Sequence, residues 1–490
     1  MTSRPSPFGP LDRLVKRAGT LAGSWGARAR ASTTVGQERA ILRLFGVAGL
    51  DAAGQPLAGA AVERWLRTSR GGLGGGIALP FAMGLIEYDL EPQRLALDVA
   101  SGAVDLALEA ELLHEADRRS LAETEARRLA SLAVERIDAD RTARRELQGL
   151  LGEARRPWLG TTLIEPDLDE ARDEVVRLAT AGFDLLRVEV PMGRELADRL
   201  LDAGMEAPQW QPRDRPRPAV VGESEDNEPA PTGSQRALSR LRAIADRIAA
   251  ERLGYVRLAT SIPPLGVPEG AVVAAFERVD LVEADPIAEI VAGGVDPDRA
   301  LSDHAFARRI HRRADTLIGI GPGPLVVAPD MAAGVPSLPA TRSGRALACQ
   351  LIGVALSLGD GVPADRIMIG AYPGWLADEP AASARILAEV AIRRALFPDH
   401  LLRFDEPALA NTAAADGWPF IVSAVLARSG PAAMVMRRAS ADPGRAAAVA
   451  RASALVAAEV LTVAPPGALE GAAGIHAAAT ITAALDTLES

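Results

Sequence analysis

Charged residues gather within or just after several short apolar segments that are rich in β-branched residues. Arg187, Arg257 and Arg403 each lie in such a segment, and Arg437 and Arg438 end a fourth one. If these segments are neighbouring strands, arginines from four strands would converge, and guanidinium groups bind carboxylates and phosphates well. We therefore expect a site for an anionic ligand. A structural ion-pair cluster would use the same residue types.

Acidic residues accompany these arginines at a spacing of two. Arg187 and Glu189 lie on one segment, and Glu283 and Asp285 lie on another. Alternate residues of a strand face the same side, so each pair would point the same way. A salt bridge at the rim of a sheet or barrel is the alternative interpretation of any such pair.

The sequence lacks the spacings of several common catalytic sites. His304 and His311 lie seven apart on a predicted helix, which differs from the i, i+4 spacing of paired helical zinc ligands. We expect them to be surface or partner-facing histidines. We find no Ser-His-Asp motif, no Walker loop and no metal-ligating cluster, so no metal site is expected.

Two residue types occur once each. Cys349 is the only cysteine, which excludes a disulfide within one chain, and we expect it to be a core residue of the helix Ser343–Leu358. Lys16 is the only lysine. No lysine inside the fold can therefore form a Schiff base with a carbonyl cofactor.

Composition narrows the class of protein. The 490 residues are 48% hydrophobic and 24% charged, with a net charge of −10, as in ordinary globular proteins. An acidic surface repels phosphate backbones, which argues against general nucleic-acid binding. We find no run of about 18 apolar residues and no secretory signal, so we expect no membrane span and a cytoplasmic protein.

The elements that would position the charged residues alternate between strands and helices after Pro157. Eight strand candidates are found at Leu159–Ile164, Asp184–Val190, Tyr255–Ser261, Val279–Asp285, Thr316–Ile320, Arg366–Ala371, Leu401–Phe404 and Ala433–Arg437. Most intervals between their starts are near the roughly 31 residues of a (β/α)8 unit. We predict an α/β protein with a closed TIM barrel; an open doubly wound sheet is the alternative.

Three regions are expected. Residues 1–155 are predicted to be a helical accessory region, residues 156–462 the barrel, and residues 463–490 a C-terminal helix. A proline-rich, acidic insertion at residues 205–234 follows the second strand. This position is at the strand C-terminal face, where barrel enzymes have their sites, so both a lid and a solvated spacer are consistent with it.

One segment resembles a known family. Thr33–Gly49, TTVGQERAILRLFGVAG, resembles the N-terminal "TTVsvERtvLRLlGvdG" of the α subunits of lysine 5,6-aminomutase and D-ornithine 4,5-aminomutase. Tyr255–Leu258 resembles the family's "YIRL", Arg299–Asp303 its "RTLVD", and Leu396–Asp399 its "IFPD". The order and spacing hold from about residue 30 to residue 440.

The resemblance implies a function. It implies a large subunit whose barrel presents pyridoxal 5′-phosphate to adenosylcobalamin. A smaller cobalamin-binding partner subunit would carry the Schiff-base lysine, in keeping with the scarcity of lysine here. The reaction would be a radical 1,2-migration of an amino group on an amino acid such as lysine or ornithine, which makes the protein an isomerase.

The resemblance also implies site residues. Arg187 and Arg257 match family arginines, and Asp285 matches an aspartate near the pyridoxal ring, so all three are expected to bind the cofactor. We expect Arg187 and Arg257 to hold the phosphate and Asp285 the pyridine nitrogen, with all three pointing into one cavity. Arg403 replaces a family lysine and is expected to bind the substrate carboxylate. No catalytic residue is assigned.

Several pocket motifs depart from the family. The family's "RTTGQS" reads Arg187–Met192 here, "GHAFEM" reads Gly370–Trp375 without the histidine, and "LKYMPPTK" reads Leu402–Leu409 without either lysine. The chain is therefore a divergent member. A catalytically silent scaffold or regulatory subunit, paired with a cobalamin-binding partner, is the alternative function.

Overall fold

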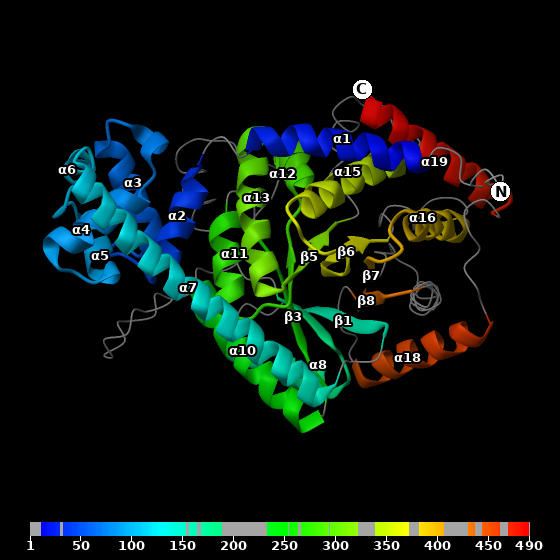
Figure 1. Cartoon of the computed structure of the whole chain (residues 1–490). Coiled ribbons are helices and arrows are strands. Elements are labelled where there is room, and N and C mark those ends of the chain that lie inside the picture. Colours follow the sequence, from blue (N-terminus) through cyan, green and yellow to red (C-terminus); the bar gives the residue numbers. More distant parts are fainter. Residues whose placement is uncertain are drawn as a thin grey trace.

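A closed barrel of eight parallel strands forms the centre of the molecule (Figure 1). The computed structural model describes residues 11–29, 33–152, 156–163, 168–188, 233–252, 254–262, 266–293, 295–321, 339–371, 382–405, 430–436, 443–460 and 469–489. The strands are β1 Trp158–Leu163, β2 Leu185–Val188, β3 Arg257–Ser261, β4 Leu281–Glu283, β5 Leu317–Ile320, β6 Ile367–Gly370, β7 Leu401–Asp405 and β8 Ala432–Met436. Each pairs with the next, and β8 pairs with β1.

The barrel prediction is confirmed, and the open sheet is excluded. All eight strand candidates are strands, with ends that differ by a few residues. The cause is residue composition, since short β-branched and leucine-rich runs bury both faces when helices cover a parallel sheet. Most of the insertion at residues 205–234 lies outside the described residues.

Helices cover the outside of the barrel. They are α8 Leu168–Thr180, α10 Gly233–Arg252, α11 Val267–Phe276, α12 Pro286–Gly293, α13 Pro297–Ala314, α15 Pro339–Gly359, α16 Ala382–Leu396 and α18 Pro443–Val460, with the short η3 Ala364–Arg366 before β6. Outward-facing strand residues such as Leu186, Leu258 and Ile318 pack with these helices in one core. Within the described ranges, every helix is too short or too polar to span a bilayer.

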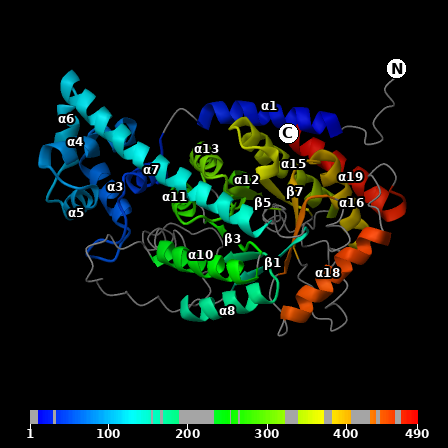
Figure 2. The same cartoon turned by 60° about the horizontal axis from the view of Figure 1, so that its bottom comes forward.

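The N-terminal helices divide between two cores. They are α1 Leu11–Ala29, α2 Val35–Leu44, α3 Leu57–Thr68, η1 Gly72–Gly75, α4 Ala78–Tyr88, α5 Pro92–Ser101, α6 Leu106–Leu112 and α7 Ala116–Leu151. Helices α3 to α6 share a separate core around Trp65 and Phe81, at one side of the barrel (Figure 2). Helix α1 instead packs on the barrel through Leu11 and Leu14. The boundaries at residues 155 and 462 stay predictions.

Both chain ends contribute to one part of the helix layer. The last described helix, α19 Gly471–Glu489, packs with α1 against α15 (Figure 1). Arg17 on α1 donates from Nε to the carbonyl of Leu488 at 2.9 Å, and Arg13 pairs with Glu489.

The long helix α7 joins the separate helical core to the barrel. Leu129 packs in the helical core, whereas Ile137 packs with Ala275 of α11 and Ala314 of α13. Further along, Arg144 is buried and donates to backbone carbonyls that precede β4 and β5, including that of Val279 at 3.2 Å. One helix of 36 residues therefore spans both parts.

Helix α2 is bonded to the barrel by polar side chains. Arg39 Nη2 and Arg43 Nε each lie 2.7 Å from an oxygen of Glu269, in the first turn of α11. Thr34 caps α2 and donates to Asp303 of α13. The segment Thr33–Gly49 therefore docks the helical core onto the barrel.

Candidate functional site

The inside of the barrel has an apolar layer below a charged layer. Side chains that alternate along the strands point inward, and eight of them form one buried cluster: Trp158, Leu185, Ala259, Leu281, Leu317, Met368, Leu401 and Ala433. Two residues further along their strands lie Arg187, Ser261, Glu283 and Arg403, which therefore share the inward face. They stand towards the strand C-terminal ends, where barrel enzymes have their active sites.

Glu283 joins two arginines from distant strands. Its Oε2 lies 2.9 Å from Nη2 of Arg187 on β2, and its Oε1 accepts a hydrogen bond from Nη1 of Arg403 on β7. Arg187 Nη2 also lies 3.5 Å from the hydroxyl of Ser261. We call Arg187, Glu283 and Arg403 the mouth triad.

The mouth triad is ionised and carries a net positive charge. Burial opposes ionisation of Glu283, but the charges of Arg403 and then Arg187 outweigh burial and lower the pKa of that carboxyl. Two guanidinium groups and one carboxylate give a net charge of +1. Arg187 is the most exposed of the three, with 29% of its side chain accessible.

A glycine allows Glu283 to lie across the barrel. Gly319 on β5 is the strand neighbour of Glu283, and a Cβ at position 319 would lie 3.1 Å from Glu283 Cγ. Such a contact is tighter than most real Cβ contacts, so a larger residue there would shift the carboxylate.

Arg257 lies inside the barrel at the end opposite the mouth triad. The prediction that it lies beside Arg187 is therefore wrong. Arg257 begins β3, and its guanidinium carbon stands 3.8 Å from the ring centroid of Trp158, the first residue of β1. The side chain is almost fully buried, at 3% exposure. Cation–π stacking at the base of the barrel therefore accounts for this arginine, and its position does not support phosphate binding at the mouth.

Asp285 lies at the start of a helix. It follows β4, and its Oδ1 accepts a hydrogen bond from the backbone N–H of Ile287 at 3.0 Å, in the first turn of α12. Its charge also acts on Cys349 of α15. The structure thus brings together Arg187 and Arg403, but through Glu283, and the expected cavity shared by Arg187, Arg257 and Asp285 is not formed.

A buried polar network supports the same end of the barrel. The Gln350 side-chain amide donates to the carbonyls of Gly321 at 2.8 Å and Gly370 at 3.0 Å, which follow or end β5 and β6. Arg393 donates to Gln350 Oε1 at 2.9 Å and pairs with Glu389 one turn earlier. Sequence reasoning missed these residues, although the i, i+4 spacing of Glu389 and Arg393 on one helix was a usable signal.

The network continues to the last described helix. Nε2 of His476 and the hydroxyl of Thr480, both on α19, lie 2.8 Å and 3.2 Å from Glu389 Oε1. Glu389 is fully buried, and because each of its oxygens has a partner its charge is tolerated there. Helix α19 is thereby connected to the strand ends that border the mouth.

Comparison with known proteins identifies the family. The family model described as the D-lysine 5,6-aminomutase TIM-barrel domain of the α subunit matches residues 11–204 and 230–414, which is more than half of the chain. The chain belongs to this family.

Two curated relatives agree with this result. The lysine 5,6-aminomutase α subunit of Fusobacterium nucleatum subsp. nucleatum is 26% identical over 381 residues, or 77% of this chain. That of Acetoanaerobium sticklandii is 24% identical over 376 residues, or 76% of this chain. The matched region spans 66% of the length of each relative. At this identity the chain is a divergent aminomutase α-subunit homologue.

The motifs that the homologue shares with the family make contacts that hold the fold together. Thr33–Gly49 docks α2, and Arg299–Asp303 on α13 receives it. Tyr255, at the base of the barrel, lies with its hydroxyl 2.8 Å from Asp280 Oδ1, and Arg242 is 3.0 Å from the other oxygen. Contacts at this end of the barrel stabilise the fold, since barrel enzymes have their active sites at the other end.

The departing pocket motifs lie mostly outside the described residues. This holds for Glu189–Met192, Tyr372–Trp375 and Glu406–Leu409, and also for Arg437 and Arg438. Among the described residues, no group of three or more histidine, cysteine or acidic side chains could hold a metal ion.

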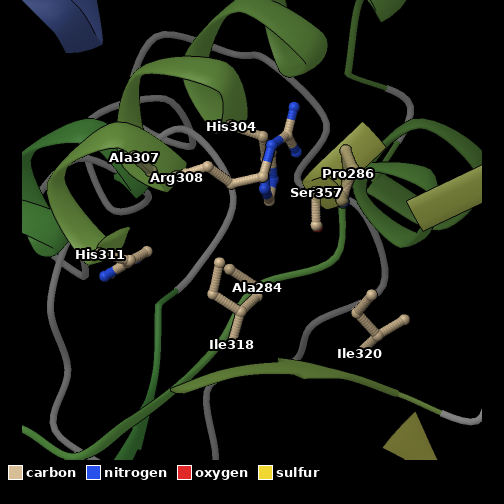
Figure 3. A pocket seen from close by; sticks show the side chains of 9 residues that line it. All are labelled: Ala284, Pro286, His304, Ala307, Arg308, His311, Ile318, Ile320 and Ser357. Carbon is tan, nitrogen blue, oxygen red and sulfur yellow. The ribbon is translucent and has the colours of Figure 1, made fainter. Parts of the chain in front are cut away.

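The two histidines of helix α13 are buried, so the expectation of surface or partner-facing histidines is wrong. His304 and His311 are 2% and 1% exposed and line a small cavity with Arg308 and Ser357 (Figure 3). His304 Nε2 lies 3.1 Å from Glu289, and burial lowers the pKa of His311 to about 3. The cavity is on the outward side of β4 and β5, so it is not part of the mouth.

Cys349 is expected to be unreactive in the folded homologue. It packs against the barrel core from α15, and burial, followed by the charge of Asp285, raises the pKa of its thiol to about 12. Because the thiolate is the reactive form, labelling by a disulfide reagent at pH 8 should be at least ~100-fold slower than in denaturant. Equal rates in the two states would show that the thiol is accessible.

Proposed function

We propose that this chain is the large subunit of an aminomutase-type isomerase that acts on an amino acid or a related amine. The mouth triad carries the proposal, because it places two arginines inside a barrel of this family at the face where barrel enzymes bind substrates. The reaction class is radical 1,2-amino migration. Lysine and ornithine are the first substrates to test, and a cytoplasmic location is part of the proposal.

Two cofactors and a partner belong to the proposal by family membership. Adenosylcobalamin would supply the radical chemistry, and pyridoxal 5′-phosphate would hold the substrate amine. The described residues do not fit pyridoxal phosphate by themselves. Lys16 lies exposed on α1, outside the barrel, and Arg257 is at the wrong end to share a phosphate with Arg187. A smaller cobalamin-binding subunit that carries the Schiff-base lysine must therefore complete the site.

The first experiment tests the assembly. The chain is co-expressed with a candidate partner, and the purified complex is examined by absorption spectroscopy and for turnover of lysine, ornithine and other amino acids. A cobalamin spectrum that changes on substrate addition, together with turnover, is expected. A stable complex with no spectral change and no turnover would leave a silent scaffold or regulatory subunit, which the structural use of Arg257 and Asp285 also favours.

The second experiment tests Arg403. Arg403→Ala removes a charge-assisted hydrogen-bond donor, so kcat/KM should fall about 10- to 100-fold, mainly through KM. Arg403→Lys restores the family's residue type and should lose less. Arg177→Ala removes a guanidinium on the surface of α8, where it pairs with Glu174, and serves as the matched control. Equal kcat/KM values for Arg403→Ala and Arg177→Ala would contradict a substrate role.

A further inference from the structure

The mouth triad has a charge that selects among anions. We propose that Glu283 restricts the Arg187–Arg403 site to a single negative charge, so that it receives a substrate carboxylate and discriminates against a dianionic phosphate. The inference rests on the proposed anion site, and adds the residue that determines its specificity.

Glu283 already uses both of its oxygens on the two arginines. Oε2 engages Arg187 at 2.9 Å and Oε1 engages Arg403, so each guanidinium has one donor committed to the carboxylate. Within the described part of the chain, Nε of Arg187 is buried without a hydrogen-bond partner. The Arg187 side chain as a whole is 29% exposed, so an incoming oxygen can approach its accessible part beside Glu283, without replacing the carboxylate.

Packing keeps Glu283 in this position. Its side chain lies over Gly319 on the neighbouring strand, where even a single added Cβ would come within 3.1 Å of Glu283 Cγ. The carboxylate side chain is 16% exposed and flanked by two guanidinium groups. It therefore remains charged, and the net charge of the triad is +1 rather than +2.

Electrostatics then distinguish ligands by charge. A monoanion brings the partly buried triad to neutrality, whereas a dianion leaves an uncompensated negative charge beside Glu283. Charges about 4–6 Å apart interact strongly at the effective dielectric of a protein interior. A carboxylate is thus the better ligand, and the phosphate of a cofactor requires cations from elsewhere.

The test uses two oxyanions of similar shape and different charge. Methanesulfonate carries one negative charge and sulfate carries two, and neither titrates near neutral pH. Dissociation constants for the full chain are measured by isothermal titration calorimetry at constant ionic strength, with chloride as the background ion. The readout is the ratio of the two dissociation constants, which does not depend on enzyme activity.

Four variants adjust the charge of the triad or control for it. Glu283→Gln changes the net charge from +1 to +2 with nearly the same shape, and should shift the ratio at least about tenfold towards sulfate. The double variant Glu283→Gln with Arg403→Gln returns the charge to +1, and should regain the preference for methanesulfonate. Arg403→Gln alone should weaken both anions. Glu174→Gln breaks a surface pair on α8 and should change nothing.

The outcomes separate the inference from the function on which it rests. An unchanged ratio in Glu283→Gln, with measurable binding, overturns the role of Glu283 and leaves the anion site intact. If the parent chain binds neither anion, the anion site itself fails, and the role of Glu283 with it. If Glu283→Gln does not fold, the double variant is compared with Arg403→Gln, whose triad has no net charge. Loss of Glu283 in that background adds one positive charge and should shift the ratio towards sulfate, and equal ratios in these two variants would overturn the role of Glu283.

Discussion

Replacing Glu269 by alanine is expected to lower the free energy of unfolding by about 3–5 kcal/mol. The substitution leaves Arg39 and Arg43 buried without their shared carboxylate, and side-chain exposures of 8% and 5% give water little access to them. Denaturant unfolding followed by circular dichroism measures the loss. Docking of α2 depends on this contact, so the separate helical core should also become more sensitive to proteolysis.

The matched control is an exposed glutamate that also faces two arginines. Glu123 on α7 pairs with Arg119 at 3.3 Å and Arg127 at 2.8 Å, at the surface. Glu123→Ala should change stability by about 0–1 kcal/mol. If both substitutions cost the same, the docking role of Glu269 is wrong.

The contribution of Glu269 to the free energy of unfolding depends on pH. Burial opposes its ionisation, but Arg39 and Arg43 lower the pKa of Glu269 to about 2. Its folded-state pKa lies below the unfolded value of about 4.3, so its contribution is complete above that value and is lost as pH falls through about 2. Glu269→Ala should remove this part of the acid sensitivity.

Replacing Asp303 by asparagine is expected to stabilise the protein at neutral pH. Burial raises the pKa of Asp303 to about 6, and the hydrogen bond from Thr34 only partly opposes this. The folded state therefore binds the proton more tightly than the unfolded chain, whose aspartate pKa is about 3.9. The contribution of this group is complete below about pH 4 and is lost as pH rises through about 6, a change of up to about 3 kcal/mol.

Asparagine keeps an oxygen that can accept from Thr34 but carries no charge to desolvate. Asp303→Asn should therefore flatten the decline in unfolding free energy between pH 4.5 and pH 7, which denaturant titrations at the two values measure. Asp298→Asn, on the exposed side of the same helix, should keep the parent's pH dependence. If the unfolding free energy of Asp303→Asn declines between pH 4.5 and pH 7 as steeply as that of the parent, Asp303 is ionised throughout this range.

The strands were predictable because their signal is local. Runs such as Leu317–Ile320 and Ile367–Gly370 are apolar and short, and helical patterns separate them at the spacing of a barrel. The ends were less predictable, because pairing with neighbours decides where a strand begins. Tyr255 was assigned to a strand that starts at Arg257.

The site was only partly predictable. Strand alternation placed Glu283 and Asp285 on a common face, but alternation says neither which face points inward nor which end of the barrel a residue occupies. Arg257 begins its strand and so faces the base. The partners of Glu283 lie 96 and 120 residues away in sequence, and only barrel closure brings them together.

The burial of His304 and His311 shows a different limit of prediction from the sequence. The helix α13 sequence around His304 and His311 is rich in arginine, which is typical of an exposed face. The face is buried because β4, β5 and α15 cover it, and that cover comes from segments before and after the helix in the chain.

Pairing of β1 with β8 has a consequence for synthesis of the chain. The register joins Trp158 to Ala433, so the barrel can close only after the last strand has been synthesised. At 5–20 residues per second, a ribosome needs about 14 to 55 seconds to make the intervening segment. During that time the edge of β1 exposes unpaired backbone groups that favour aggregation, so chaperone binding to the nascent chain would protect the barrel until it closes.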